Sequence, residues 1–313
     1  MRSRSTGREP ERGLSDMADN ILDPDAVSRG EALGLLARRI VEGYRVGEHR
    51  SPFHGFAIEF AQHREYVPGD DIRHLDWKVL GRSDRYYIKQ YEQDTNFVAH
   101  LAVDGSASMN YGSGKVTKLH FAKALAACLA YVILGQRDAV AVALFDEAVQ
   151  EYLPRTDSMA RIRHIMDRLA AFEASRTTRL SGALEQLAQK ARRRGIVVLI
   201  SDFFDDEEGF VNGLRLLSFS GNEVIVFHVL DHAELTFPFS GTCKFVDLEG
   251  SAELQTSPAD IRKSYLKNFG DYRQRIRRAC EKFSAHYVLA DTGKPLAEVL
   301  SGYLAFRRSV GRK

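Results

Sequence analysis

Asp104, Ser106 and Ser108 stand at alternate positions after an apolar run, and a long helical pattern follows them. A strand that delivers one carboxylate and two hydroxyls into the loop before a helix suits a hard divalent cation, because such ions take oxygen ligands. In open α/β sheets, ligands bind beyond the carboxyl ends of the strands, where the strand order reverses. Taken alone, however, the triplet is better explained as a strand end followed by a helix cap, where Asp and Ser are favoured.

A second loop, at residues 176–181, offers the hydroxyls of Thr177 and Thr178 just before a helical pattern. Thr178 is also placed to cap the helix expected from Leu180, and without further support capping is the better interpretation. The choice between the two threonines as cation ligands stays open.

A third loop follows the fully apolar run 196–200, which leads through Ser201 to Asp202. Asp205 and Asp206 lie closer to the next helix and suit its cap and its dipole better. Asp202 is therefore left without a structural role at the end of a buried strand, a position that favours a functional one.

The hydrophobic pattern predicts the elements that position these loops. Strands are expected at 97–103, 139–145, 149–153, 196–200, 223–230 and 286–289, and helices at 24–44, 117–134, 159–171, 180–194, 207–217, 260–283 and 295–306. Continuously apolar strands separated by helices predict a parallel sheet covered on both faces. The expected fold class is therefore α/β, with a doubly wound, mostly parallel central sheet of Rossmann type.

The front of the chain has a different composition. Residues 45–94 are rich in Gly, aromatic and charged residues, which predicts short strands at 53–60 and 86–91 and a turn at 68–71. We expect a disordered tail at 1–20, an N-terminal helix with a small β-rich subdomain at 21–95, and the α/β domain at 96–313.

Composition argues against several classes of partner. With 44 Lys and Arg against 42 Asp and Glu, the net charge of +2 gives no reason to expect nucleic acid or a membrane surface. Cys128, Cys243 and Cys280 are odd in number and far apart, which indicates buried thiols in a reducing compartment. The longest apolar run, 124–134, is shorter than the about 20 residues that span a bilayer, and the N-terminus lacks the pattern of a secretory signal. These features predict a cytoplasmic protein without membrane insertion.

Three other chemistries fit the sequence poorly. Residues 112–115 read Gly-Ser-Gly-Lys, but Met109 takes the first glycine position of a phosphate-binding loop and Val116 follows the lysine. Ser106 stands where a haloacid-dehalogenase-like phosphatase needs its second aspartate. The serine-hydrolase pattern Gly-x-Ser-x-Gly is not formed around Ser106 or Ser108.

An Asp-x-Ser-x-Ser motif, a threonine loop and a strand-end aspartate in this order resemble the von Willebrand factor A fold with its metal-ion-dependent adhesion site. In that family these groups bind a cation directly or through water, and one coordination position stays open for an acidic group of a partner. The resemblance implies Mg²⁺ (or Mn²⁺) at Asp104, Ser106, Ser108, Thr178 and Asp202. One departure is Arg179, which replaces an acidic residue of the family's Thr-Asp-Leu helix start.

Residues 64–77 (REYVPGDDIRHLDW) and 87–92 (YIKQYE) resemble the signature of the domain-of-unknown-function 58 family, whose members carry a von Willebrand A-like domain. Residues 79–84 depart from the small-residue turn usual in that family. We expect Arg64, Arg73 and Asp76 to form an ion-pair cluster that Trp77 packs against the sheet. A structural hairpin explains this segment better than partner binding, for which the candidates are Arg64, Asp70, Asp71, Arg73, Asp76 and Trp77.

The resemblance implies a non-enzymatic, metal-dependent protein–protein interaction module. Its partner would offer an acidic side chain, and the family's gene neighbourhood points to a MoxR-type AAA+ ATPase that works in assembly or maturation of other complexes. Two alternatives stay open. One is a hydrolase that uses the same ion, with Asp205, Asp206 or His232 as acid or base. The other is a scaffold that binds its partner without metal.

Overall fold

The structure is a computed structural model of the 313-residue chain. It describes residues 29–45, 58–68, 75–83, 86–93, 98–174, 180–191, 195–204, 207–246 and 253–310. The expected tail at 1–20 and the expected start of the first helix at 24 lie outside these ranges.

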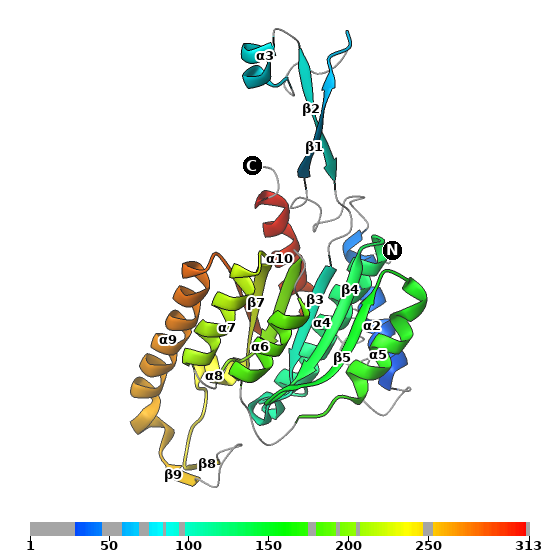
Figure 1. The fold of residues 1–313 in the computed structure, drawn as a ribbon. Coiled ribbons are helices and arrows are strands. Elements are labelled where there is room, and N and C mark those ends of the chain that lie inside the picture. The colour runs from blue at the N-terminus through cyan, green and yellow to red at the C-terminus, as the bar shows by residue number, and fades with distance from the viewer. Residues whose placement is uncertain are drawn as a thin grey trace, which may run out of the picture.

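A six-stranded sheet forms the centre of the molecule (Figure 1). Its strands are β3 (Val98–Asp104), β4 (Ala139–Phe145), β5 (Val149–Thr156), β6 (Ile196–Ser201), β7 (Glu223–Leu230) and β10 (His286–Asp291). The order is β10-β7-β6-β3-β4-β5, and all neighbours are parallel except β5, which pairs antiparallel with β4. The order reverses between β3 and β6, as in doubly wound sheets. The predicted fold class and all six predicted strands of the sheet are confirmed.

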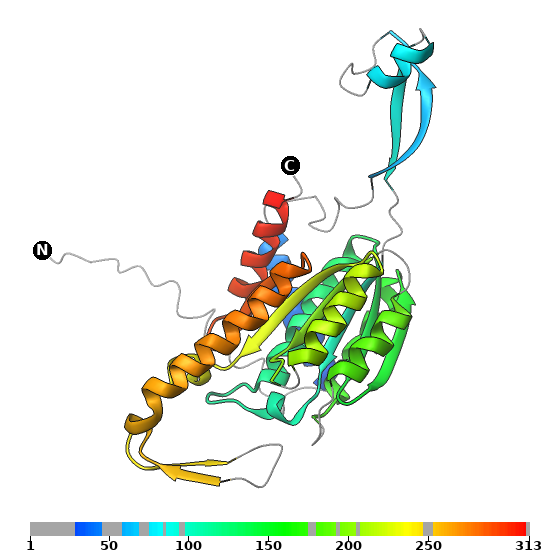
Figure 2. The same ribbon diagram turned by 60° about the vertical axis from the view of Figure 1, so that its left-hand side comes forward.

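Helices cover both faces of this sheet (Figure 2). The apolar side chains of the strands are divided between two core clusters, one on each face. On one face lie α2 (Arg29–Arg45), α4 (Lys118–Gly135), α5 (Ile162–Ala171) and α10 (Leu296–Val310). On the other lie α6 (Leu180–Lys190), α7 (Glu207–Phe219) and α9 (Pro258–Lys282). Every residue of β3, β4 and β6 is buried, which is why these strands are almost entirely apolar, with His100, Asp104 and Ser201 as their polar members.

Helix α4 lies deepest in the fold. The hydroxyl of its N-cap Thr117 accepts a hydrogen bond from the backbone N–H of His120, and buried residues run along its whole length. Among the described residues it is the one helix long and apolar enough to cross a membrane, but 78% of it is buried inside the fold. Its apolar composition is therefore accounted for by packing against the sheet.

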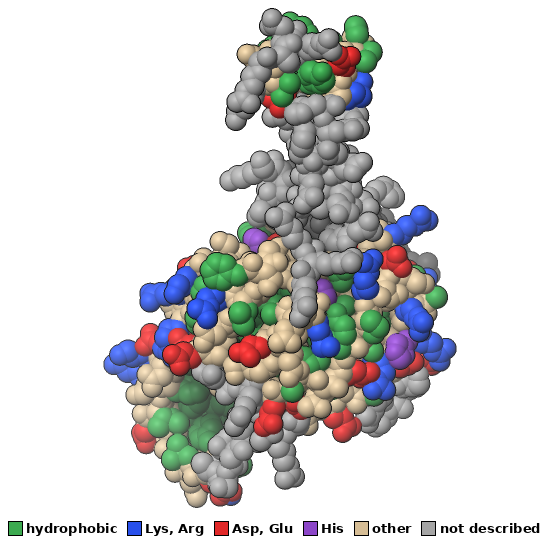
Figure 3. All heavy atoms as spheres, in the orientation of Figure 1, with side chains coloured by type: hydrophobic (Ala, Val, Ile, Leu, Met, Phe, Trp, Pro, Cys, Tyr) green, Lys and Arg blue, Asp and Glu red, His purple; other side chains and the backbone are tan. Residues whose placement is uncertain are grey.

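The chain between β7 and α9 forms elements that the hydrophobic pattern did not predict. These are α8 (His232–Thr236) and the antiparallel pair β8 (Cys243–Val246) and β9 (Glu253–Thr256). The rings of Phe237 and Phe245 stack with centroids 5.8 Å apart, and Tyr265 of α9 packs on Phe237. Figure 3 shows hydrophobic side chains gathered in a hollow at this end of the molecule, whereas acidic and basic side chains are interspersed on the rest of the visible face.

The front segment forms an antiparallel pair, β1 (Ile58–Glu65) and β2 (Tyr87–Gln93), with a short helix α3 (Trp77–Ser83) between them in sequence. Figure 1 shows this hairpin beyond the amino ends of the parallel strands. Helix α2, in contrast, packs against α4 and α5, and its Leu36 belongs to the main core. The proposed division of the chain at residues 95 and 96 stays a prediction.

Short single-turn 3-10 helices complete the described chain, at Ala107–Asn110 after β3 and at Met159–Arg161 before α5. Cys128 and Cys280 are buried and Cys243 is half-buried, and all three are free thiols. Buried thiols were expected, and the half-exposed Cys243 is the exception.

Candidate functional site

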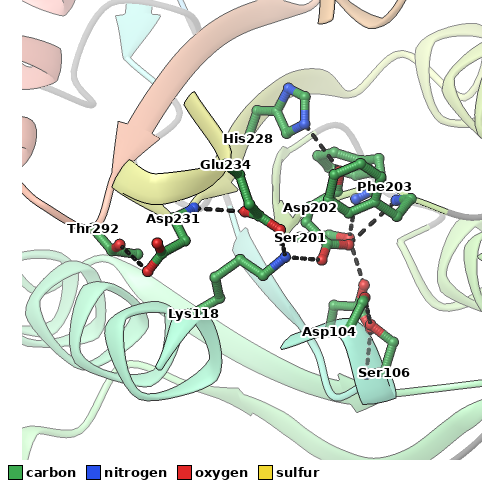
Figure 4. Close-up of polar contacts among 12 residues, drawn as sticks. Asp104, Ser106, Lys118, Ser201, Asp202, Phe203, His228, Asp231, Glu234 and Thr292 are labelled. Atoms are coloured by element: carbon green, nitrogen blue, oxygen red, sulfur yellow. Dashed lines mark hydrogen bonds and ion pairs between the residues drawn. The ribbon is translucent and has the colours of Figure 1, made fainter. Parts of the chain in front are cut away.

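The ends of β3 and β6 meet where the strand order reverses, and their last residues, Asp104 and Ser201, are joined by a hydrogen bond. The Ser201 hydroxyl donates a short hydrogen bond to Oδ2 of Asp104. The other oxygen, Oδ1, accepts from the backbone N–H of Ser106 at 2.8 Å (Figure 4). Asp104 is 2% exposed, so both carboxylate oxygens are fixed inside the protein.

The two serines of the motif lie together beside this carboxylate. Their hydroxyl oxygens are 3.1 Å apart, with Ser106 buried and Ser108 half-buried. The backbone N–H of Gly105 donates to the carbonyl of Phe145 at the end of β4, which fixes the start of the loop. The Asp-x-Ser-x-Ser loop therefore presents three oxygen-bearing side chains in one place, as the sequence predicts.

The environment of Asp104 disfavours a negative charge. Burial is the main cause and the nearby Asp202 carboxylate is the second, and together they raise the pKa of Asp104 to about 7 in spite of the bonds from Ser201 and Ser106. Among the residues that the structure describes, Asp104 has no Lys or Arg partner. Within the described part of the chain, its charge is therefore stabilised by neutral donors alone.

Asp202, by contrast, already has a cation. Its Oδ2 lies 2.7 Å from Nζ of Lys118, and its Oδ1 accepts the backbone N–H of Phe204 at 3.2 Å. Both side chains of this ion pair are 1% exposed. The expectation that Asp202 has no structural role is therefore wrong: it is the main anionic partner of a buried lysine.

Lys118 also binds a second carboxylate. Its Nζ lies 2.8 Å from Oε1 of Glu234, while Oε2 of Glu234 accepts the backbone N–H of Asp231 in a capping box at the start of α8 (Figure 4). The ammonium thus joins α4, the end of β6 and α8. Sequence reasoning missed Lys118, although a lysine in the first turn of an apolar helix opposes the helix dipole and so calls for an anionic partner.

A second set of contacts fixes the backbone at Asp202. The Asp202 carbonyl lies 2.9 Å from Nε2 of His228 and 3.1 Å from the Tyr272 hydroxyl. Burial lowers the pKa of His228 to about 3, so its ring is neutral and donates from Nε2 to this carbonyl. The next residue, Phe203, is buried with a left-handed φ of 55°, a conformation that needs such support. His228 is a core residue, as predicted.

Several expected site residues are placed elsewhere or lie outside the described residues. Thr177 and Thr178 lie in the undescribed stretch 175–179, and Asp205 and Asp206 form the undescribed stretch 205–206. His232, considered as a minor site member, is 57% exposed and pairs with Asp291 at 3.1 Å.

Arg64 belongs to β1 and Trp77 begins α3, two elements that lie beyond the amino ends of the parallel strands, whereas Asp104 ends β3 (Figure 1). Asp70, Asp71 and Arg73 are outside the described residues. Asp76 accepts the backbone N–H of Val79 at 3.3 Å and so caps α3, while Trp77 is 65% exposed. The expectation that Trp77 packs against the sheet is wrong, because it begins a short helix and its side chain points to solvent. Partner binding by this segment stays a prediction.

Asp104, Ser106 and Ser108 suit a hard cation, because one carboxylate and two hydroxyls converge here and the described residues supply no Lys or Arg partner for the carboxylate. Asp202 is a poorer ligand, since one of its oxygens is held by Lys118. The described residues contain no group of three or more His, Cys, Asp or Glu arranged to hold a metal. Mg²⁺ would therefore be held mainly by the motif itself, with water completing its shell.

Known proteins resemble this chain over most of its length. Residues 62–275 match the family described as protein of unknown function DUF58. The chain belongs to the DUF58 family. Uncharacterized protein Mb1516 of Mycobacterium bovis and uncharacterized protein Rv1480 of Mycobacterium tuberculosis are each 26% identical to it over 302 residues, which is 94% of this chain and 93% of theirs.

Solved structures with a similar arrangement include BatB from Bacteroides thetaiotaomicron, at a TM-score of 0.44 and 18% identity over 68% of this chain and all of that one. The SpRpn10 VWA domain has a TM-score of 0.39 and 14% identity over 66% of this chain and 94% of that one. The match confirms the predicted family, and the sheet of this DUF58 protein has the predicted doubly wound, mostly parallel α/β arrangement.

Proposed function

We propose that this protein is a non-enzymatic protein–protein interaction module that docks its partner through the Asp104 end of the sheet. The observation that carries the proposal is the buried Asp104 carboxylate, which lies beside two motif hydroxyls and lacks a cationic partner among the described residues. Mg²⁺ or Mn²⁺ held there would offer a coordination position to an acidic side chain of the partner. The motif supports this role, because a hard cation with an incomplete protein shell accepts further oxygen ligands.

The partner is proposed to be a MoxR-type AAA+ ATPase in the cytoplasm, acting in assembly or maturation of other complexes. This part rests on the family resemblance. His228, which contacts the Asp202 carbonyl, is buried and neutral, which makes it a poor acid or base for the alternative of a hydrolase.

Thermal melting with EDTA, Mg²⁺ or Mn²⁺ tests the metal. A cation that binds the native state raises the melting temperature by mass action. We expect a rise in wild type that disappears in Asp104→Asn and persists in Asp146→Asn, a matched control that alters another buried carboxylate at the end of the neighbouring β4.

The partner is tested by binding of the purified MoxR-type ATPase with Mg²⁺ and with EDTA. Equal binding in both would indicate a metal-independent scaffold, and no metal-induced rise in wild type would contradict the proposal.

A further inference from the structure

The Asp202 half of the site already contains a cation supplied by the chain. The Lys118 ammonium lies 2.7 Å from Asp202 and 2.8 Å from Glu234, and its side chain is 1% exposed. The same Nζ is 4.8 Å from the centre of the Phe204 ring and 5.8 Å from that of Tyr111. Two carboxylates and two aromatic faces thus surround one ammonium group.

This set of neighbours fits an ammonium better than a metal ion. Aromatic faces attract Lys⁺ through the ring quadrupole, but they supply no ligand atoms. Mg²⁺, in contrast, requires near-octahedral oxygen coordination. A dehydrated lysine is tolerated inside a protein when carboxylates compensate its charge, as Asp202 and Glu234 do here.

Its place in the chain indicates that Lys118 is held there firmly. Lys118 is the first residue of α4, directly after the N-cap, where the helix dipole repels a positive charge. Its backbone N–H donates to the carbonyl of Tyr111, so the main chain is fixed as well as the side chain. The ammonium stays in an unfavourable helix position because the two carboxylates outweigh the dipole.

We propose that Lys118 is the resident cation of the Asp202 half of the site: it occupies Asp202 and Glu234 permanently and confines divalent ions to Asp104, Ser106 and Ser108. The site is then divided, with an internal ammonium on one side and an exchangeable metal ion on the other. This deepens the proposed function by defining where a metal ion is held. The role of Lys118 itself does not depend on the partner.

Mn²⁺ titration of the full-length protein, followed by calorimetry and by thermal melting, tests the division. Removing the ammonium in Lys118→Met frees two carboxylates, so we expect this variant to bind Mn²⁺ at least about tenfold more tightly than wild type does. Without Mn²⁺ the variant should melt at a lower temperature than wild type, and Mn²⁺ should raise its melting temperature. Lys118→Met/Asp202→Asn should lose this gain. Lys123→Met, which removes a lysine from the next turn of α4, should bind Mn²⁺ like wild type.

The proposal is overturned if Lys118→Met binds Mn²⁺ no more tightly than wild type, or if Asp202→Asn leaves the gain intact. Should Lys118→Met fail to fold, Lys118→Met/Glu234→Gln removes a positive and a negative charge together and is measured in the same way, with the same two outcomes. Absence of Mn²⁺ binding to wild type would contradict the metal in the proposed function. The comparison of variants would still decide the role of Lys118.

Discussion

Phe172 packs on Gly105 so closely that a Cβ atom added to Gly105 would lie 2.3 Å from the Cζ atom of the ring. Phe172 directly follows α5, and Gly105 directly follows Asp104. The end of α5 therefore presses on the loop that carries Ser106 and Ser108. The backbone of Gly105 is not in the left-handed region, so the close contact with the Phe172 ring is what favours glycine in the Asp-Gly-Ser sequence.

Gly105→Ala should consequently destabilise the fold by about 1–3 kcal/mol, the usual cost of forcing an extra carbon into a packed region. Chemical denaturation would measure this. Gly114→Ala is a matched control, because no atom lies within 4 Å of a Cβ at that exposed position. Gly105→Ala/Phe172→Leu should recover part of the loss, and equal stability of Gly105→Ala and Gly114→Ala would contradict the packing argument.

Acid should weaken the fold through His100. Burial lowers the pKa of His100 to about 4 from an ordinary 6.5, so between these values the unfolded chain binds a proton that the folded protein does not. The contribution of His100 to the free energy of unfolding is therefore fully present above pH 6.5. It decreases by about 3 kcal/mol as the pH drops to 4. His100→Gln should flatten the dependence of unfolding free energy on pH over this range. Parallel curves for variant and wild type would be inconsistent with a buried neutral His100.

Tyr272→Phe should loosen the loop after β6. The Tyr272 hydroxyl lies 2.5 Å from the Phe203 carbonyl and 3.1 Å from the Asp202 carbonyl, so its loss leaves two acceptors with one donor fewer. We expect a loss of about 1–2 kcal/mol in the free energy of unfolding. Tyr287→Phe is a comparison variant, because the Tyr287 hydroxyl contacts Nδ1 of His228 and reaches Asp202 only through that ring. A Tyr272→Phe variant as stable as wild type would mean that Phe203 keeps its left-handed backbone without this support.

Helix α10 should be stabilised by the buried ion pair of Arg307 with Glu223. The guanidinium of Arg307, 1% exposed in its side chain, donates two hydrogen bonds to Glu223 at the start of β7. Glu223→Gln removes the negative charge that faces this buried guanidinium and should cost up to about 3–5 kcal/mol. Glu223→Gln/Arg307→Met should cost less than Glu223→Gln alone, as a double-mutant cycle of denaturation curves would reveal. Additive losses would argue against coupling of the two residues.

The strands of the central sheet were predictable because burial on both faces leaves no alternative to continuous apolar runs. β4 and β7 begin and end at the predicted residues, and Asp104 closes β3. The grouping of Asp104 with Ser106 and Ser108 was predictable for a different reason, their closeness in the sequence. Residues two apart after a strand end cannot move far from each other.

The remaining features depend on contacts between distant parts of the chain. Lys118 and Asp202 are 84 positions apart, and no local pattern joins them. β8 and β9 have four residues each, too few to show a hydrophobic period, and their shape follows from aromatic packing on α8 and α9. The exposure of Trp77 was missed because α3 starts where a β-hairpin was expected.

Helix α4 carries the ammonium of the site at its first residue and the centre of the apolar core along the rest of its length. We therefore expect opening of the polar end to be coupled to opening of the core, because the helix that carries Lys118 also packs against the sheet along its length. The amide protons of α4 should be among the slowest to exchange with solvent. A metal ion or partner bound at Asp104 would slow their exchange further. Binding at this end of the sheet could therefore be detected from the amide protons of the buried helix α4.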